Sequence, residues 1–105
     1  MVENIDAAQY QEVIKHGNCL VVLGSSWCKD CVKIEPFLKE LSEEFEENLK
    51  IYKIDSKLEL DLSMQLSVRS IPTLIFYRNG EEVGTRLIEP QTKQLIADEI
   101  KKNFL

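Results

Sequence analysis

Two of the three cysteines, Cys28 and Cys31, are separated by two residues, and this C-x-x-C spacing serves two kinds of chemistry in proteins. Two thiols one helical turn apart can form a disulfide, and such a pair cycles between dithiol and disulfide through a mixed-disulfide intermediate. The same pair can also bind a metal ion, for which His16 and Cys19 would complete a set of four ligands with finger-like spacing. The cysteines alone therefore leave a redox site and a structural zinc site as alternatives.

The strand predicted before the motif favours the redox alternative. Residues 19–23 form a continuously apolar run bounded by glycines, which is typical of a buried central strand. If the strand extends over residues 19–24, five steps of about 3.3 Å place Cys19 roughly 16 Å from its far end, and four zinc ligands could not then converge on one ion. We therefore expect Cys19 to be a small buried hydrophobic residue and the protein to carry no metal.

The change from strand to helical periodicity after Trp27 places Cys28 at the start of a helix. The first N–H groups of a helix lack intrahelical partners and carry partial positive charge, so a sulfur at that point is stabilised as its thiolate. We therefore predict that Cys28 attacks a disulfide and that Cys31, one turn further along, resolves the mixed disulfide. The helix is predicted to end near Asn48, to contain Pro36 and to have one apolar face: Ile34, Phe37, Leu38, Leu41 and Phe45.

The remaining pattern predicts an α/β fold. Strands are expected at 49–54, 74–77 and 82–88, the last two joined by an Asn79-Gly80 hairpin turn, with a further short strand before the first helix as an option. Helices are expected from an Asp6 cap toward His16, over 58–66, and from Pro90 and Thr92 onward, with Leu95, Ile96, Ile100 and Phe104 facing inward. This order implies a central mixed β-sheet of four or five strands flanked by helices on both faces, formed by residues 1–105 as a single domain.

The segment from Leu58 to Leu66 carries a conflicting pattern. Its apolar residues alternate strictly, as in a strand, yet the segment is rich in helix formers and has no β-branched residue. We predict a helix, with Leu58, Leu62 and Leu66 on one face and Leu60 and Met64 on the other. If exposed, the latter two would form an apolar patch of the kind that binds protein partners.

Several segments together resemble the thioredoxin family. Trp27-Cys28-Lys29-Asp30-Cys31, with Pro36 in the following helix, is similar to the family's active-site segment. Ile71-Pro72-Thr73 resembles its cis-proline loop, and Tyr77-Arg78-Asn79-Gly80 resembles its hairpin. The resemblance covers nearly the whole chain in the right order, and it implies the thioredoxin fold.

The resemblance also implies an activity. It implies a thiol–disulfide oxidoreductase that reduces or exchanges protein disulfides through Cys28 and Cys31, with no cofactor beyond that redox-active pair. A flavoprotein of the thioredoxin-reductase kind would supply the electrons. It further implies a cis Ile71–Pro72 bond beside the cysteines, Ile71 backbone groups that pair with an extended substrate segment, and Trp27 on the surface that partners touch.

Some positions depart from the family's pattern. Lys29-Asp30 replaces the usual Gly-Pro between the cysteines, and the two charges act on the Cys28 thiolate with opposite signs. The family's buried acid falls at Val22, its usual lysine neighbour at Ile51, and a small glycine at about Ile88. These replacements remove the family's proton relay, so we expect an altered rate and substrate range.

Composition excludes several other classes of function. The formal net charge is 13 − 18 = −5, which argues against binding to nucleic acid or to an anionic membrane. No apolar run approaches the roughly 20 residues that span a bilayer, and no signal-peptide pattern is found, so we expect a cytoplasmic protein. We also expect it to be a monomer. The alternative to an enzyme is a thioredoxin-like binding module that holds a protein partner, or a metal or iron–sulfur centre, with little redox turnover.

Overall fold

Strand β2 (Asn18–Gly24) lies at the centre of a five-stranded mixed sheet in the computed structural model, which describes residues 1–105. The sheet order is β1-β3-β2-β4-β5; β1, β3 and β2 run parallel, and β4 is antiparallel to both of its neighbours. The other strands are β1 (Val2–Asn4), β3 (Lys50–Asp55), β4 (Thr73–Arg78) and β5 (Glu81–Ile88). The predicted α/β fold with a mixed sheet is confirmed, and the optional short strand is β1, at the sheet edge.

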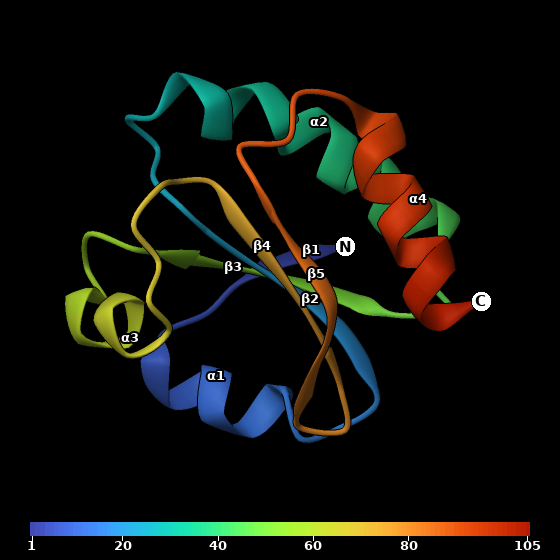
Figure 1. The fold of residues 1–105 in the computed structure, drawn as a ribbon, viewed down its shortest axis with the longest axis horizontal. Coiled ribbons are helices and arrows are strands. Elements are labelled where there is room, and N and C mark those ends of the chain that lie inside the picture. The colour runs from blue at the N-terminus through green and yellow to red at the C-terminus, as the bar shows by residue number, and fades with distance from the viewer.

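Four helices cover the two faces of this sheet (Figure 1). Helices α2 (Lys29–Glu44) and α4 (Lys93–Phe104) pack on one face, and α1 (Ala7–Val13) and α3 (Leu60–Gln65) lie on the other. No helix combines the length and the apolar character needed to cross a membrane.

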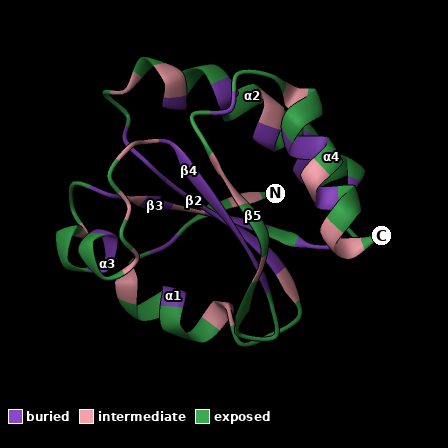
Figure 2. Cartoon of the chain, in the orientation of Figure 1, coloured by how far each residue is buried: buried purple, intermediate pink, exposed green.

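The apolar run of β2 is continuous because both of its faces are buried. Leu20 and Val22 belong to the core beneath α2 and α4, whereas Cys19, Val21 and Leu23 belong to the core on the α1 and α3 side. Figure 2 shows the central strands buried and the outer sides of the helices exposed. The carboxyl end of β2 is therefore held from both sides at the point where the chain leaves it for the cysteine motif.

Short-range signals in the sequence formed as predicted. The Asp6 carboxylate caps α1 by accepting the N–H of Gln9 at 2.8 Å, and the Gln9 side chain accepts the N–H of Asp6 at 2.9 Å. Asn79 and Gly80 have φ values of 47° and 90°, the left-handed conformations that a two-residue hairpin turn requires. Thr92 caps α4. Each of these features depends only on neighbours within a few residues.

The ends of the predicted helices differ from the observed ones. Helix α1 ends at Val13 rather than near His16, α2 ends at Glu44 rather than near Asn48, and α3 begins two residues later than expected, at Leu60. The Asp55 carboxylate explains the late start of α3, because it accepts the N–H groups of Lys57 and Leu58 and holds residues 55–58 in a turn.

Two predicted core positions are wrong. Leu58 lies in that turn and is 80% exposed, so it does not share a buried face with Leu62, which does pack into the core. Leu95 is 51% exposed, because the inward face of α4 is formed by Ile96, Ala97 and Ile100. The first error comes from the Asp55 turn, which takes the place of the start of the predicted helix. The second comes from the orientation of α4, which packing against the sheet decides.

Candidate active site

Cys28 is the N-cap residue of α2, as its position between strand and helix predicted. Its Sγ accepts the backbone N–H of Cys31 at 3.3 Å, so a first-turn donor of the helix points at the sulfur. Two hydrogen bonds hold residues 25–28 in a turn that positions Cys28. The Cys28 N–H donates to the Ser25 carbonyl at 3.3 Å, and Ser25 Oγ accepts the N–H of Trp27 at 3.1 Å. Cys28 is half-buried, so the residue is partly accessible to solvent.

The loop before β4 brings a second group to this sulfur. The Ile71–Pro72 peptide bond is cis, and the Cys28 thiol donates to the Ile71 carbonyl oxygen across 3.6 Å. The loop is held by Thr73, whose hydroxyl donates to the Ser70 carbonyl at 2.6 Å, and by β5, since the Glu89 N–H donates to the Pro72 carbonyl at 2.8 Å. Residues far apart in the sequence thus meet at Cys28.

Cys31 lies beneath Cys28 and differs from it chemically. It is 7% exposed and, like Cys28, is a free thiol. Burial raises the pKa of Cys31 to about 12, with a further contribution from its hydrogen bond with Cys28. Its Sγ packs against Gly24: a Cβ added at Gly24 would lie 3.1 Å from that sulfur. At neutral pH Cys31 is therefore a protonated, buried thiol.

The two residues between the cysteines lie at the surface. Lys29 is exposed, and Asp30 is half-buried in the first turn of α2, where its negative charge is favourable to the helix dipole. The Asp30 carboxylate is also one of the smaller causes of the raised Cys31 pKa. The Asp30 charge therefore acts on Cys31 as well as on the helix dipole.

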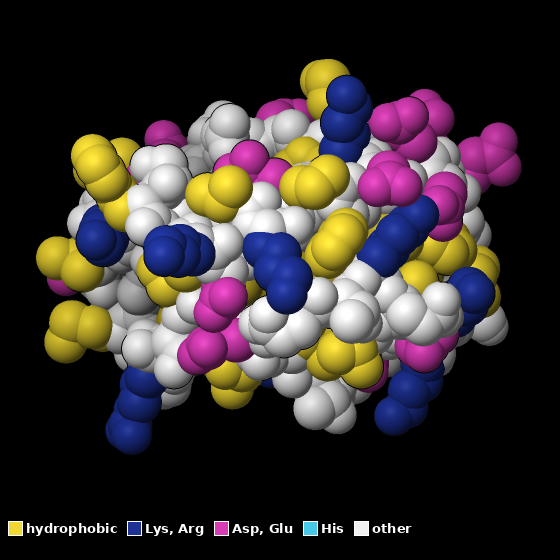
Figure 3. Space-filling view, turned by 90° about the horizontal axis from the view of Figure 1, so that it is seen from above, with side chains coloured by type: hydrophobic (Ala, Val, Ile, Leu, Met, Phe, Trp, Pro, Cys, Tyr) yellow, Lys and Arg dark blue, Asp and Glu magenta, His cyan; other side chains and the backbone are white.

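Large apolar side chains are exposed around the site. Trp27 is 83% exposed, Leu60 61%, Met64 76% and Ile88 61%. Figure 3 shows several exposed hydrophobic side chains at the left end of the face that is seen from above. Leu60 and Met64, which the sequence left as either buried or exposed, are therefore exposed.

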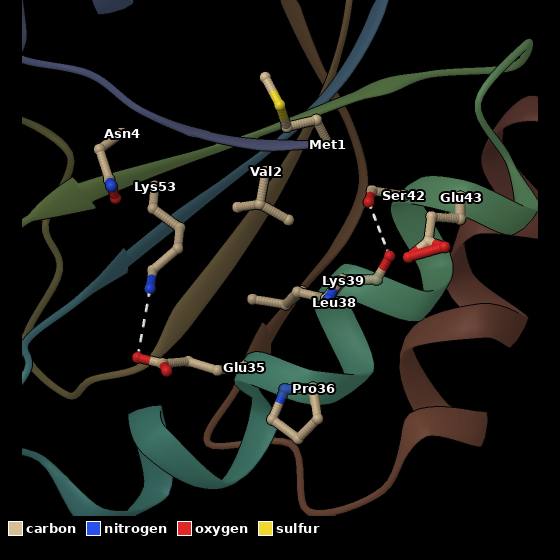
Figure 4. A pocket seen from close by; sticks show the side chains of 10 residues that line it. All are labelled: Met1, Val2, Asn4, Glu35, Pro36, Leu38, Lys39, Ser42, Glu43 and Lys53. Atoms are coloured by element: carbon tan, nitrogen blue, oxygen red, sulfur yellow. Dashed lines mark hydrogen bonds and ion pairs between the residues drawn. The ribbon is translucent and has the colours of Figure 1, made fainter.

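The resemblance placed the family's lysine position, beside Val22, at Ile51, but the residue beside Val22 is Lys53. In the parallel register of β2 and β3, Val22 pairs with Lys53, whereas Ile51 pairs with Leu20 and is buried in the core. The Lys53 ammonium reaches from β3 to the carboxylate of Glu35 on α2, at an Nζ–Oε1 distance of 3.3 Å (Figure 4). Sequence reasoning missed both members of this pair.

One signal in the sequence could have identified Glu35. It follows Cys31 by four residues, a spacing that places two side chains on the same face of a helix. Only the packing of α2 over β3 shows that Lys53 meets it there.

Cys19 lies apart from the other two cysteines. It is 1% exposed in the core beneath α1 and α3, as expected for a small buried hydrophobic residue, and burial raises its pKa to about 11. The structure does not bring His16 and Cys19 together with Cys28 and Cys31. The four residues considered as metal ligands therefore do not form one site.

Comparisons with known proteins agree with the geometry. The family model described as thioredoxin matches residues 1–102. A thioredoxin from Pyropia yezoensis is 34% identical over 98 residues, covering 92% of this chain and 91% of the relative. Thioredoxin-2 from Saccharomyces cerevisiae is 33% identical over 99 residues, covering 90% of this chain and 93% of the relative. A chloroplastic M-type thioredoxin from Spinacia oleracea is 27% identical over 103 residues, covering 96% of this chain and 56% of the relative.

Solved structures show the same fold. The thioredoxin of Plasmodium falciparum superposes with a TM-score of 0.87 at 22% identity, covering 95% of this chain and 97% of that one. Mitochondrial thioredoxin 3 from Saccharomyces cerevisiae superposes with a TM-score of 0.85 at 18% identity, covering 96% of this chain and 94% of that one. With a matching family model, relatives above 30% identity and the thioredoxin fold, the chain belongs to the thioredoxin family.

Proposed function

We propose that this protein is a thiol–disulfide oxidoreductase that reduces, or exchanges, disulfides in other proteins through Cys28 and Cys31. One observation carries the proposal. The sulfur of half-buried Cys28 caps a helix and lies within hydrogen-bond reach of both the Cys31 N–H and the Ile71 carbonyl, with a second thiol one turn below. Membership of the thioredoxin family supports the same chemistry.

The reaction proceeds in two exchange steps. In the first, the Cys28 thiolate attacks one sulfur of the substrate disulfide, and the other substrate sulfur leaves as a thiolate that takes up a proton. In the second, Cys31 loses its proton and attacks Cys28 Sγ, the bond between Cys28 and the substrate breaks, and the second substrate thiol is released. Two electrons pass to the substrate, and Cys28 and Cys31 are left as a disulfide. A flavoprotein of the thioredoxin-reductase kind returns the electrons, and no further cofactor takes part.

Proteins fit this site better than small disulfides. Ile71 and Pro72 form the edge against which an extended substrate segment lies, with Ile71 backbone groups pairing with it, and exposed Trp27 contributes contact area beside Cys28. Leu60 and Met64 extend the apolar surface, which favours partners with apolar side chains near their disulfide. Lys29 and Asp30 set the redox poise. The protein acts as a monomer, and we place it in the cytoplasm, where such dithiols are kept reduced.

A disulfide-reduction assay tests the proposal. Reduction of insulin with dithiothreitol as electron donor is expected to be lost in Cys28→Ser and to persist in the matched control Cys19→Ser, because Cys19 is buried away from the site. Cys31→Ser is expected to accumulate a mixed disulfide with the substrate. Activity that survives Cys28→Ser would rule out this mechanism. A metal retained stoichiometrically through Cys28 and Cys31 during purification would instead favour the binding-module alternative.

A further inference from the structure

A small hollow of about 130 Å³ lies beside Cys31, at the carboxyl ends of β2 and β3. Its lining includes Cys31 and Glu35 from α2, Val22 from β2, and Lys53 and Asp55 from β3. A hollow of this size with polar groups in its wall has room for several water molecules. The residues that line the hollow together with Cys31 therefore include carboxylates and an ammonium group.

Glu35 and Lys53 border this hollow and also reach the surface. Both residues also line a larger groove of about 670 Å³ between β1, β3 and α2, whose lining is drawn in Figure 4. Their side chains are partly exposed, Lys53 by 33% and Glu35 by 47%. The Glu35–Lys53 ion pair thus borders both the hollow beside Cys31 and the open groove.

Glu35 is the carboxylate best placed to take a proton from this hollow. The other charged groups near Cys31 are Asp30 and Lys53, together with Asp55 across the hollow. The Asp55 carboxylate is held by two backbone N–H groups of the turn that follows it, and Asp30 lies in the first turn of α2 and does not line the hollow. The Glu35 carboxylate is bound only by the Lys53 ammonium.

The second exchange step needs such an acceptor. Because Cys31 is buried, it is protonated at neutral pH, and its proton has to leave as its sulfur attacks. Val22, which pairs with Lys53 across the two strands, has an apolar side chain and cannot accept a proton. As the Cys31–Cys28 bond forms, the attacking sulfur gives up electron density and its proton becomes more acidic, so a carboxylate can accept it during bond formation.

We propose that Glu35, oriented by Lys53, accepts the proton of Cys31 through water in the hollow during resolution of the mixed disulfide. The inference rests on the proposed function. In this step the Cys31–Cys28 bond forms, the bond between Cys28 and the substrate breaks, and the substrate sulfur leaves with the electron pair. The proton passes from Cys31 to Glu35 and then to the groove, while the released thiolate is protonated from solvent.

Stopped-flow reaction of the reduced protein with an aromatic disulfide that releases a coloured thiol separates the two steps. Attack by Cys28 releases the first equivalent of thiol, and resolution by Cys31 releases the second. Glu35→Gln is expected to leave the first phase unchanged within about twofold and to slow the second at pH 7 by about 100-fold, the lower end of general acid–base effects. In this variant the second phase should rise in proportion to hydroxide concentration, so the deficit shrinks as the pH increases.

Two further variants control for structural effects. Glu43→Gln removes another carboxylate from the same helix and the same groove, but Glu43 does not line the hollow, so both phases should match the wild type. Glu35→Asp keeps the carboxylate and should restore most of the second phase.

The outcomes separate the two proposals. A second phase that is as fast in Glu35→Gln as in the wild type, or equal slowing by Glu43→Gln, would overturn the role of Glu35 while leaving the dithiol mechanism intact. A wild-type protein that releases no thiol in the first phase would overturn the dithiol mechanism itself.

Discussion

Replacing Gly24 with alanine tests the close packing beneath the active site. Gly24 ends β2, and its φ lies outside the left-handed region, so alanine can adopt its backbone conformation. A Cβ at this position would lie 3.1 Å from Cys31 Sγ and 3.5 Å from Cys31 Cβ. The shorter distance is tighter than an ordinary contact, and Cys31 is fixed on α2, so the helix start has to shift by a few tenths of an ångström.

The magnitude follows from two opposing effects. Overpacking a well-packed core costs about 1–3 kcal/mol. Replacing glycine by alanine lowers the entropy of the unfolded chain and returns about 0.4–1 kcal/mol. Gly24→Ala should therefore destabilise the reduced protein by about 1–2 kcal/mol, which lowers Tm by roughly 5–10 °C for a domain of this size.

Urea unfolding of the reduced protein at pH 7, in a double-mutant cycle with Cys31→Ala, isolates the contact. Removing the sulfur removes the atom that the new methyl group meets, so Gly24→Ala should be neutral or stabilising by up to about 1 kcal/mol in the Cys31→Ala background. The sign of the effect thus reverses between the two backgrounds. Equal destabilisation in both would show that contact with Cys31 is not the cause.

Three further predictions concern stability. Because burial raises the pKa of Cys19 from its ordinary value of 9.0 to about 11, the stability that the protonated thiol contributes is present below pH 9 and is lost as the pH rises toward 11. The difference in unfolding free energy between wild type and Cys19→Ala should therefore shrink by about 2 kcal/mol between pH 8 and pH 11, and a constant difference would contradict the shift. Tyr10 and Tyr77 share a buried hydroxyl–hydroxyl hydrogen bond of 2.6 Å, so Tyr77→Phe should cost about 1–3 kcal/mol in urea unfolding. The double variant with Tyr10→Phe should cost little more than the single one, whereas additive costs would refute the coupling. Glu89 has a φ of 52° and an exposed side chain, and Glu89→Gly should raise the unfolding free energy by about 0.5–1 kcal/mol because glycine adopts this conformation without strain; thermal unfolding with no gain would refute it.

Features that depend on near neighbours could be predicted from the sequence. Asp6 and Gln9 form a capping box within one turn, and Asn79-Gly80 specifies its hairpin through local backbone preferences. The position of Cys28 at a strand–helix junction followed from the change of hydrophobic period around it. The dithiol, the different roles of its two sulfurs and the order of strands and helices could therefore be predicted from the sequence alone.

Features that depend on strand register and helix packing could not be predicted from the sequence. The resemblance placed Ile51 beside Val22, whereas Lys53 pairs with Val22, because the pairing of parallel strands is set by contacts between distant segments. The exposure of Leu58 followed from a turn held by Asp55, which periodicity does not report.

By itself, the sequence determined which residues form the dithiol motif and where along the chain the elements that present it begin, since local backbone and capping interactions act within a few residues. Tertiary structure alone decided what surrounds Cys31. The cis Ile71–Pro72 bond was expected from the resemblance and is present. The hollow and the pairing of Glu35 with Lys53 exist only when α2 packs at the carboxyl ends of β2 and β3. That packing joins residues distant in sequence, so their contacts cannot be derived from the spacing of residues along the chain.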